Sequence, residues 1–565
     1  MRSLLPLLYL LSVWTAEAGA SDPNLPFMDY IDNNHMVCLK WGFDNLQGNI
    51  TLKFIVNTTG WVGFGFSPNG GMAGADILMG GVGPNGTYFS DRHATGNSMP
   101  VVDEQQSYTL LSLIESEGQT IMTVQRPIRA CDNKDYDITV KPVKIIYGYG
   151  EKDEYSYHGA RRGTKELNLL NYMPRTTSTN SNYLSATVDN ITIPQNQTYY
   201  HCKVMKFPNL DPNTIYHVYQ FEPVIEHVDI VHHMLLYSCP PFVTEPYDGW
   251  CYMGNLGDHC YGVVAAWGVG GGVFELPENV GIPFGGANSK TFYRLEIHYN
   301  NINNEKGRTD SSGLRLHYTA KLRKYNAGIL NTGVSPGGNY DIPPKATQFR
   351  TYGVCNTSLF SQLVNPVPDL QVFGVMLHTH LAGRKVRVAQ YRNGKQIHFV
   401  ALDENYDFGL QQGTLLGKIK TIKPGDEIAV ECTYSTTNRT NVTRMGLATT
   451  DEMCLAFLLY YPAIKVTTCH STPTTMTTSY LMSEDTTTSE QDKIAKQESF
   501  IKNHPHIQYA GNEEDKYVFN PNGTVREMMK TPTVNCQFPG AVTSGTSWIV
   551  NPAGIILLLL SIAIM

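Results

Sequence analysis

The sequence is poor in charged residues and lacks several patterns that would indicate particular functions. Lys, Arg, Asp and Glu make up 16% of the 565 residues, and the net charge is −7. A nucleic-acid-binding protein usually carries a basic stripe, so no nucleic-acid partner is expected. No two cysteines have the C-x-x-C spacing of zinc sites. The apolar run at 554–565 is shorter than the roughly 20 residues of a full membrane span.

Glycine, proline and aromatic residues are abundant. The chain has 50 Gly, 31 Pro and 11% aromatic residues, a composition that favours short strands joined by turns. Apolar and polar residues alternate in segments such as 37–41 and 50–56, which predicts half-buried strands. We therefore predict an all-β protein with several domains.

Both ends of the chain indicate the secretory pathway. Residues 1–20 have a basic start, an apolar centre and a small-residue cleavage site, as signal peptides do. Nine N-x-S/T sequons and eleven cysteines agree with a secreted glycoprotein. The tail 546–565 fits a membrane span or a lipid-anchor signal, and a soluble product is the third alternative. The domains would then be lumenal or extracellular, on the endoplasmic reticulum, another endomembrane or the cell surface.

Composition changes along the chain suggest its division. A Thr/Ser/Asn-rich stretch and breaks near Trp267–Gly286 and Pro343–Pro344 separate strand-rich regions, and residues 490–501 read as a short helix. The predicted parts are a signal peptide (1–20), a β-sandwich (25–160), a linker (161–195), two tandem sandwiches (196–340 and 341–475), a Thr/Ser-rich and C-terminal segment (476–545) and a hydrophobic tail (546–565).

Histidines occur at strand positions in three short segments. His378 and His380 are two apart, so in a strand they share a face and form a natural pair of metal ligands. His298 lies on the polar face of its strand. His232 and His233 are adjacent and can reach one metal only at a strand end, a bulge or a strong twist. A purely structural role for each segment stays open.

Methionine narrows the choice of metal. Imidazole suits zinc, copper, iron or nickel, whereas a thioether favours Cu(I). Met453, in the segment Asp451–Cys454, is a candidate thioether ligand, although a methionine there is more often an ordinary core residue.

These segments resemble, in order, those of the copper type II ascorbate-dependent monooxygenases. The matching stretches are H-H-M at 232–234, L-E-I-H-Y at 295–299, H-T-H-L-A-G-R-K at 378–385 and D-E-M-C at 451–454. D-S-S-G-L-R at 310–315 and Y-T-A-K-L at 318–322 resemble the dopamine β-hydroxylase branch and its DBH-like relatives. Residues 25–160 resemble the DOMON domain of that branch.

The resemblance implies a site and a reaction. His232, His233 and His298 would hold one copper ion, and His378, His380 and Met453 a second. Tyr200 and His378 would be the catalytic residues. Two coppers per chain, ascorbate as electron donor and O₂ as co-substrate would hydroxylate a C–H bond of a small molecule. The two copper-binding domains would be antiparallel, jelly-roll-like sandwiches.

The resemblance also narrows the partners. The peptide-oxidising branch has an arginine two residues before H-x-H, where this chain has Met376, so a phenylethylamine-like amine is the expected substrate. The hydrophobic tail implies membrane attachment, and the dopamine branch implies homo-oligomers. The alternative is a secreted or membrane-anchored metal- or ligand-binding protein without turnover. Met72, Met79, His93 and Met99 are either ligands in its N-terminal domain or ordinary loop and core residues.

Cysteine pairing follows from the same resemblance. The expected bridges are Cys202–Cys251, Cys239–Cys260, Cys355–Cys469, Cys432–Cys454 and Cys131–Cys536. Cys38 is then left over, as a buried free thiol or an intermolecular link.

Overall fold

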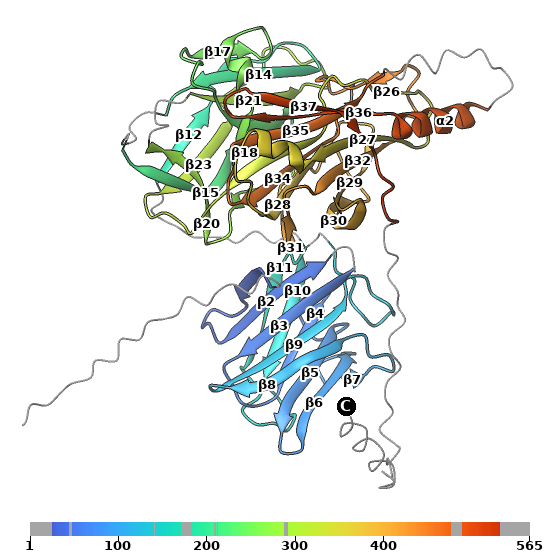
Figure 1. The fold of residues 1–565 in the computed structure, drawn as a ribbon. Helices are drawn as coiled ribbons and strands as arrows, with labels where there is room; N and C mark the ends of the chain where they lie inside the picture. Colours follow the sequence, from blue (N-terminus) through green and yellow to red (C-terminus); the bar gives the residue numbers. More distant parts are fainter. Residues whose placement is uncertain are drawn as a thin grey trace, which may run out of the picture.

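The computed structural model describes residues 25–44, 48–139, 142–170, 182–207, 211, 213–286, 292–475 and 489–530. Strands in antiparallel sheets dominate, and the prediction of an all-β protein is confirmed. The strands form a lower, N-terminal body and an upper part made of a middle and a C-terminal body (Figure 1). The predicted signal peptide and hydrophobic tail lie outside the described residues. Among those described, no helix has the length and apolarity needed to cross a membrane.

The N-terminal body is a sandwich of two sheets around one apolar core. In β3 the alternate residues Ile50, Leu52, Phe54 and Val56 are buried, as period two requires. The first sheet has the order β1 (Phe27–Tyr30), β2 (Val37–Asp44), β3 (Asn49–Val56), β9 (Gln119–Pro127), β8 (Thr109–Ser116). The second has the order β11 (Arg162–Leu167), β10 (Val143–Tyr149), β4 (Val62–Ser67), β5 (Asp76–Gly83), β6 (Gly86–His93), β7 (Val101–Val102).

The middle body also has two main sheets. One has the order β12 (Asn182–Thr187), β23 (Gly313–Thr319), β15 (Ile215–Val224), β20 (Val280–Gly285), β24 (Tyr325–Asn326), with β19 (Phe274–Glu275) paired to β15. The other has the order β17 (Tyr247–Trp250), β14 (Thr198–Met205), β21 (Tyr293–Asn300), β16 (Val231–Ser238), β18 (Gly262–Gly268). The short elements are β13 (Ile191–Thr192), β22 (Thr309–Asp310) and the 3-10 turn η1 (Leu256–His259).

The C-terminal body packs a seven-stranded sheet against a four-stranded one. The larger has the order β31 (Thr414–Ile422), β28 (Leu370–His378), β34 (Leu455–Tyr461), β25 (Gly328–Val334), β35 (Val466–Pro473), β36 (His506–Asn512), β37 (Tyr517–Gly523). The smaller has the order β27 (Phe349–Asn356), β32 (Glu427–Tyr434), β29 (Gly383–Arg392), β30 (Lys395–Asp403). The remaining elements are β26 (Asp341–Ile342), β33 (Thr443–Arg444), η3 (Thr357–Gln362) and α2 (Glu490–Asn503).

Two segments differ from the division expected from composition. The linker expected over 161–195 is strand at both ends, because β11 pairs with β10 and β12 pairs with β23. The segment expected over 476–545 contains the predicted helix, as α2, but also β36 and β37. These two strands extend the large sheet from β35. Local composition missed them because their pairing partner lies before the Thr/Ser-rich stretch.

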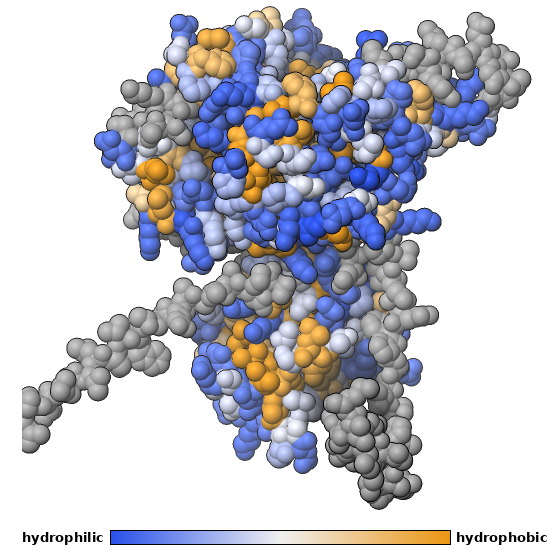
Figure 2. All heavy atoms as spheres, viewed as in Figure 1, coloured by the Kyte–Doolittle hydropathy of each residue, from blue (hydrophilic) through white to orange (hydrophobic). Residues whose placement is uncertain are grey.

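The middle and C-terminal bodies share one hydrophobic core. Middle-body residues such as Met234 and Ile297 belong to the same buried cluster as Met376, Met453 and Phe457 of the C-terminal body. The N-terminal body meets the C-terminal body where β2 lies against β31. Hydrophilic side chains cover most of the visible upper surface, and apolar patches lie on both the upper and lower parts (Figure 2). The two upper bodies are therefore packed together through a common core.

Four of the predicted disulfides are present. They are Cys202–Cys251, Cys239–Cys260, Cys355–Cys469 and Cys432–Cys454. In the loop-entropy model each contributes roughly 3–5 kcal/mol. The predicted partner of Cys131, Cys536, lies outside the described residues. Cys38 is a buried free thiol, as one of the two alternatives expected.

Candidate metal centre

A bulge in β16 brings the first three histidines together. The pairing of β16 with β21 shifts register between Val231 and His233, and His233 then pairs with His298. This irregularity is the feature that adjacent histidines need to approach one point. Donor atoms of His232, His233 and His298 all lie within 4.8 Å of one another.

The ring nitrogens of this group face each other. The Nδ1 of His233 lies 3.3 Å from Nδ1 of His232 and 3.3 Å from Nδ1 of His298. The Nε2 of His232 lies 3.2 Å from the carbonyl oxygen of Phe408, which can only accept, so His232 carries its proton there and offers a lone pair at Nδ1. Three buried imidazoles that converge through nitrogen could hold a metal ion between them.

The second group lies where β28 ends. His378 is the last residue of β28 and pairs with Leu455 at the start of β34, so continuing that register places His380 opposite Met453. Glu452 shapes the turn because its carboxylate accepts hydrogen bonds from the backbone N–H groups of His380 and Ala382, at 2.9 and 2.5 Å. Met453 is 8% exposed, and its carbonyl accepts a hydrogen bond from Tyr434.

Hydrogen bonds also fix which nitrogens are free in this group. The Gln411 Nε2 donates to the carbonyls of Thr379 and Phe408, so its Oε1 accepts from His378 Nδ1 at 2.7 Å. The Nδ1 of His380 donates to the Asp451 carbonyl at 3.2 Å. Each ring therefore presents Nε2 as a lone pair, and the Nε2 of His380 is buried without a hydrogen-bond partner in the described part of the chain.

The two groups are in contact. The ring centroids of His233 and His378 are 5.0 Å apart, and those of His298 and His380 are 6.3 Å apart. The loop between β30 and β31, residues 404–413 (the bridging loop), joins both groups. Its Phe408 stacks on His232 at 3.9 Å, while its Gln411 holds His378.

Burial keeps all five imidazoles neutral. Burial, with a neighbouring imidazole, lowers the pKa of His232 to about 3, and burial lowers the pKa of His378 to about 4. The pKa values of His233, His298 and His380 are lowered well below the ordinary value by burial and by the surrounding histidines. Neutral imidazoles with free lone pairs fit a borderline-soft transition metal. Met453, which the strand register places opposite His380, would add the soft thioether donor that suits Cu(I), so the residues fit copper.

Tyr200 lies directly against the first group. It pairs with His298 across β14 and β21, and the two rings stack in parallel at 4.4 Å. Its hydroxyl is buried and has no hydrogen-bond partner among the described residues. Burial raises the pKa of Tyr200 well above its ordinary value, so the phenol stays protonated.

Sequence reasoning missed the residues that orient the histidines. Phe408, Gln411 and Thr449 contact ring nitrogens from loops that carry no recognisable motif. Sequence reasoning also assigned no role to Glu452, although this residue stands next to Met453.

Among the described residues, the groups of three His, Cys, Asp or Glu side chains that could hold a metal do not include His93. Met79 packs into a small core cluster, His93 contacts Asp103, and Met99 is 50% exposed.

Comparison with known protein families matches three consecutive regions. The DOMON domain matches residues 33–150, and the N-terminal domain of copper type II ascorbate-dependent monooxygenase matches 184–306. The C-terminal domain of that monooxygenase matches 325–481. Among solved structures, the cytochrome b domain of pyranose dehydrogenase from Coprinopsis cinerea has a TM-score of 0.22 at 15% identity, and it covers 25% of this chain and 80% of its own.

Curated relatives cover most of the chain. DBH-like monooxygenase protein 1 from Gallus gallus is 38% identical over 84% of this chain and 79% of its own length. The Homo sapiens protein of that name is 37% identical over 81% and 77%. Dopamine beta-hydroxylase from Bos taurus is 32% identical over 82% and 78%. The chain therefore belongs to the copper type II ascorbate-dependent monooxygenase family, and in this chain a DOMON domain precedes the two monooxygenase domains.

Proposed function

We propose that this protein binds two copper ions and uses ascorbate and O₂ to hydroxylate a C–H bond of a small amine. One ion would be held by His232, His233 and His298, and the other by His378, His380 and Met453. The observation that carries the proposal is the direction of the ring nitrogens. The first three converge on one point, and the Nε2 of His380 is buried with no partner.

Copper at these positions would supply one-electron transfer and activation of dioxygen. The protein's own contribution is to position the donors. Gln411 and the Asp451 carbonyl hold the protons of His378 and His380 on Nδ1, which leaves the Nε2 lone pair of each ring free for a metal. Phe408 covers His232 and, with the shared core, limits the access of water.

Tyr200 and His378 are the residues we propose as catalytic. Tyr200 is neutral and stacked on His298, with an unpartnered hydroxyl that can donate a hydrogen bond. His378 lies 5.0 Å from His233, so it stands where the two groups meet.

We propose a small amine as the substrate class, because of the residue that stands two positions before His378 in β28. Met376 is buried and opposite Phe457, so this position offers an apolar contact instead of a cation for a carboxylate. The relatives also include the dopamine beta-hydroxylase of Bos taurus, whose name states an amine substrate.

Copper content and oxygen uptake test the proposal together. The purified chain would be loaded with copper, dialysed and analysed by mass spectrometry, and O₂ uptake would be followed with ascorbate and a panel of phenylethylamines. Two coppers per chain with amine-dependent uptake are expected. Two coppers without uptake would contradict the substrate class, and fewer than two in a folded chain would contradict the site. Tyr200→Phe should retain both coppers while it lowers the rate of uptake.

The disulfides and relatives are consistent with the secretory pathway. We propose attachment to a membrane of that pathway through residues 546–565, and association into homo-oligomers. Phase separation in detergent and the mass of the native protein by light scattering test these two points.

A further inference from the structure

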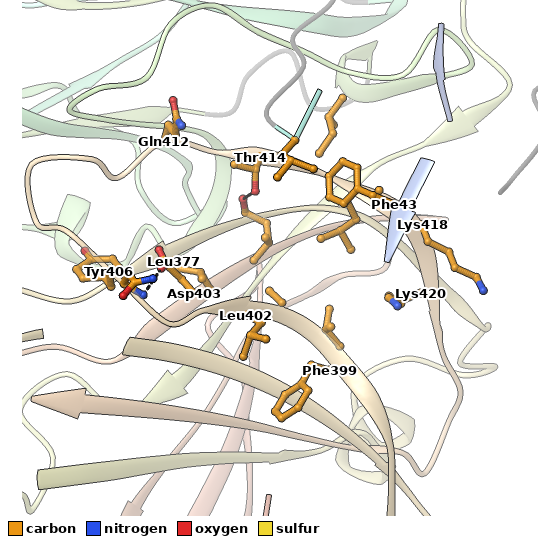
Figure 3. A pocket seen from close by; sticks show the side chains of 18 of the residues that line it. Phe43, Leu377, Phe399, Leu402, Asp403, Tyr406, Gln412, Thr414, Lys418 and Lys420 are labelled. Atoms are coloured by element: carbon orange, nitrogen blue, oxygen red, sulfur yellow. Dashed lines mark hydrogen bonds between the residues drawn. The ribbon is translucent and has the colours of Figure 1, made fainter. Parts of the chain in front are cut away.

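A cavity lies between the DOMON domain and the C-terminal monooxygenase domain, behind the metal centre. Its volume is about 380 Å³, within the range of small-molecule sites. Its walls are mostly apolar and come from both domains (Figure 3). Phe43 belongs to the DOMON domain and Leu170 packs against the core of the same N-terminal body, whereas Leu377, Leu402 and Leu415 belong to the C-terminal domain.

One end of the cavity is acidic. Asp403, the last residue of β30, lies at the end that also holds Tyr406 (Figure 3). Its carboxylate accepts a hydrogen bond from the backbone N–H of Asn405, at 2.9 Å. Within the described chain, no Lys, Arg or His lies within ion-pair distance of it. Asp407 adds a second negative charge to the same region, and burial together with Glu404 and Asp407 raises the pKa of Asp403.

The opposite end does not offer a free cation to an anionic ligand. Lys420 lies 3.8 Å from the carboxylate of Asp44, which already neutralises it. Lys418 is exposed, and in Figure 3 its side chain extends away from the centre of the cavity. Of the described residues that line this apolar space, Asp403 and Asp407 are therefore the carboxylates without a counterion, and Asp403 is the less exposed of the two.

The cavity also touches the residues that hold the two histidine groups together. Gln411 and Tyr406 line it. Gln411 bonds to His378, and its backbone N–H donates to the Val269 carbonyl of the N-terminal monooxygenase domain at 2.8 Å. Tyr406 bonds to the backbone N–H and carbonyl of Thr379, both at 3.0 Å. An occupant would thus support the bridging loop from its DOMON side.

We propose that this cavity is a second binding site, separate from the metal centre, for a small protonated amine with an apolar body. The ammonium group would pair with Asp403, and the body would fill the space between Phe43 and Leu402. Binding would hold the bridging loop, residues 404–413, against both histidine groups, so the DOMON domain would sense the amine and affect the metal centre. The proposal does not depend on turnover, because binding can be measured without the reaction.

Calorimetric titration of the full chain with 2-phenylethylamine tests the site. Saturable binding is expected, at least tenfold tighter than for 2-phenylethanol, which has the same body without the charge. Asp403→Asn should weaken amine binding at least tenfold. Asp369→Asn, which removes an exposed aspartate elsewhere in the same domain, should leave it unchanged.

Two further measurements locate the bound amine. Leu402→Trp, which fills the cavity, should weaken binding as Asp403→Asn does. Hydrogen exchange in residues 404–413 should slow when the amine is added to the wild type, and should not change in Asp403→Asn. Three results would each overturn the proposal. They are an amine affinity that is the same in wild type and Asp403→Asn, a wild-type affinity for 2-phenylethanol as high as that for the amine, and no amine binding to the wild type. If Leu402→Trp does not fold, the near-isosteric Asp403→Asn still decides.

Discussion

Replacing Gln411 with leucine should selectively weaken one of the two proposed copper sites. The side chain of Gln411 accepts the Nδ1 proton of His378 at 2.7 Å and so directs Nε2 toward the metal. Removing such an orienting partner typically lowers metal affinity about 10–100-fold, or about 1.4–2.7 kcal/mol. Leucine has a similar size but cannot accept the proton. The affinity of the site with His378, His380 and Met453 should fall by that factor, whereas the three-histidine site should retain its affinity.

A copper titration against a competing chelator measures the two affinities, and copper content after dialysis confirms them. Gln411→Leu also loses hydrogen bonds to the Thr379 and Phe408 carbonyls, each worth about 0.5–1.5 kcal/mol. Urea denaturation of the copper-free chain separates this general loss of stability from the loss of copper affinity.

Two matched variants complete the test. Gln411→Glu keeps an acceptor for His378 and should bind the second copper at least as well as wild type. Gln412→Leu changes the adjacent amide, whose side chain forms no hydrogen bond with a described histidine, and should bind both coppers normally. Two coppers bound by Gln411→Leu with wild-type affinity would show that the hydrogen bond does not orient His378 for a metal.

Three further predictions follow from other parts of the molecule. Met453→Ile should abolish hydroxylation and loosen one copper, yet change the free energy of unfolding by less than about 1.5 kcal/mol, because the swap conserves volume; a variant that still hydroxylates would remove Met453 from the site. Burial lowers the pKa values of His470 and His506 to about 4, so the unfolded chain binds more protons between pH 6.5 and 4. The free energy of unfolding should therefore decrease as the pH is lowered through that window, by up to about 1.4 kcal/mol per pH unit for each histidine. Urea denaturation of the His470→Gln/His506→Gln variant should show a smaller change of this free energy with pH. A Cβ at Gly417 would lie 2.5 Å from a backbone oxygen of β2, so Gly417→Ala should speed proteolysis between the DOMON and C-terminal domains, whereas Gly272→Ala, with open space around it, should not.

The bridging loop contains residues that orient the histidine rings and that the sequence alone could not identify. Phe408 and Gln411 lie in a segment with no periodicity, and their partners His232 and His378 are 176 and 33 residues away. The role of a residue in such a loop depends on which side chains the loop passes in the folded protein. That role can be recognised only after the strands on both sides of the loop are placed.

The sequence by itself determined the strands, the family and the candidate ligands. Period two in segments such as Asn49–Val56 depends only on which side chains alternate, and H-H-M and H-T-H are contiguous in the chain. Tertiary structure decided the features that depend on residues far apart in the sequence. It placed the bulge that turns His232 and His233 together, and it fixed the free nitrogens of His378 and His380 through Gln411 and the Asp451 carbonyl. It also added β36 and β37 to the large sheet. Ring orientation and strand pairing depend on hydrogen bonds to residues distant in sequence, and such contacts form only when the chain folds.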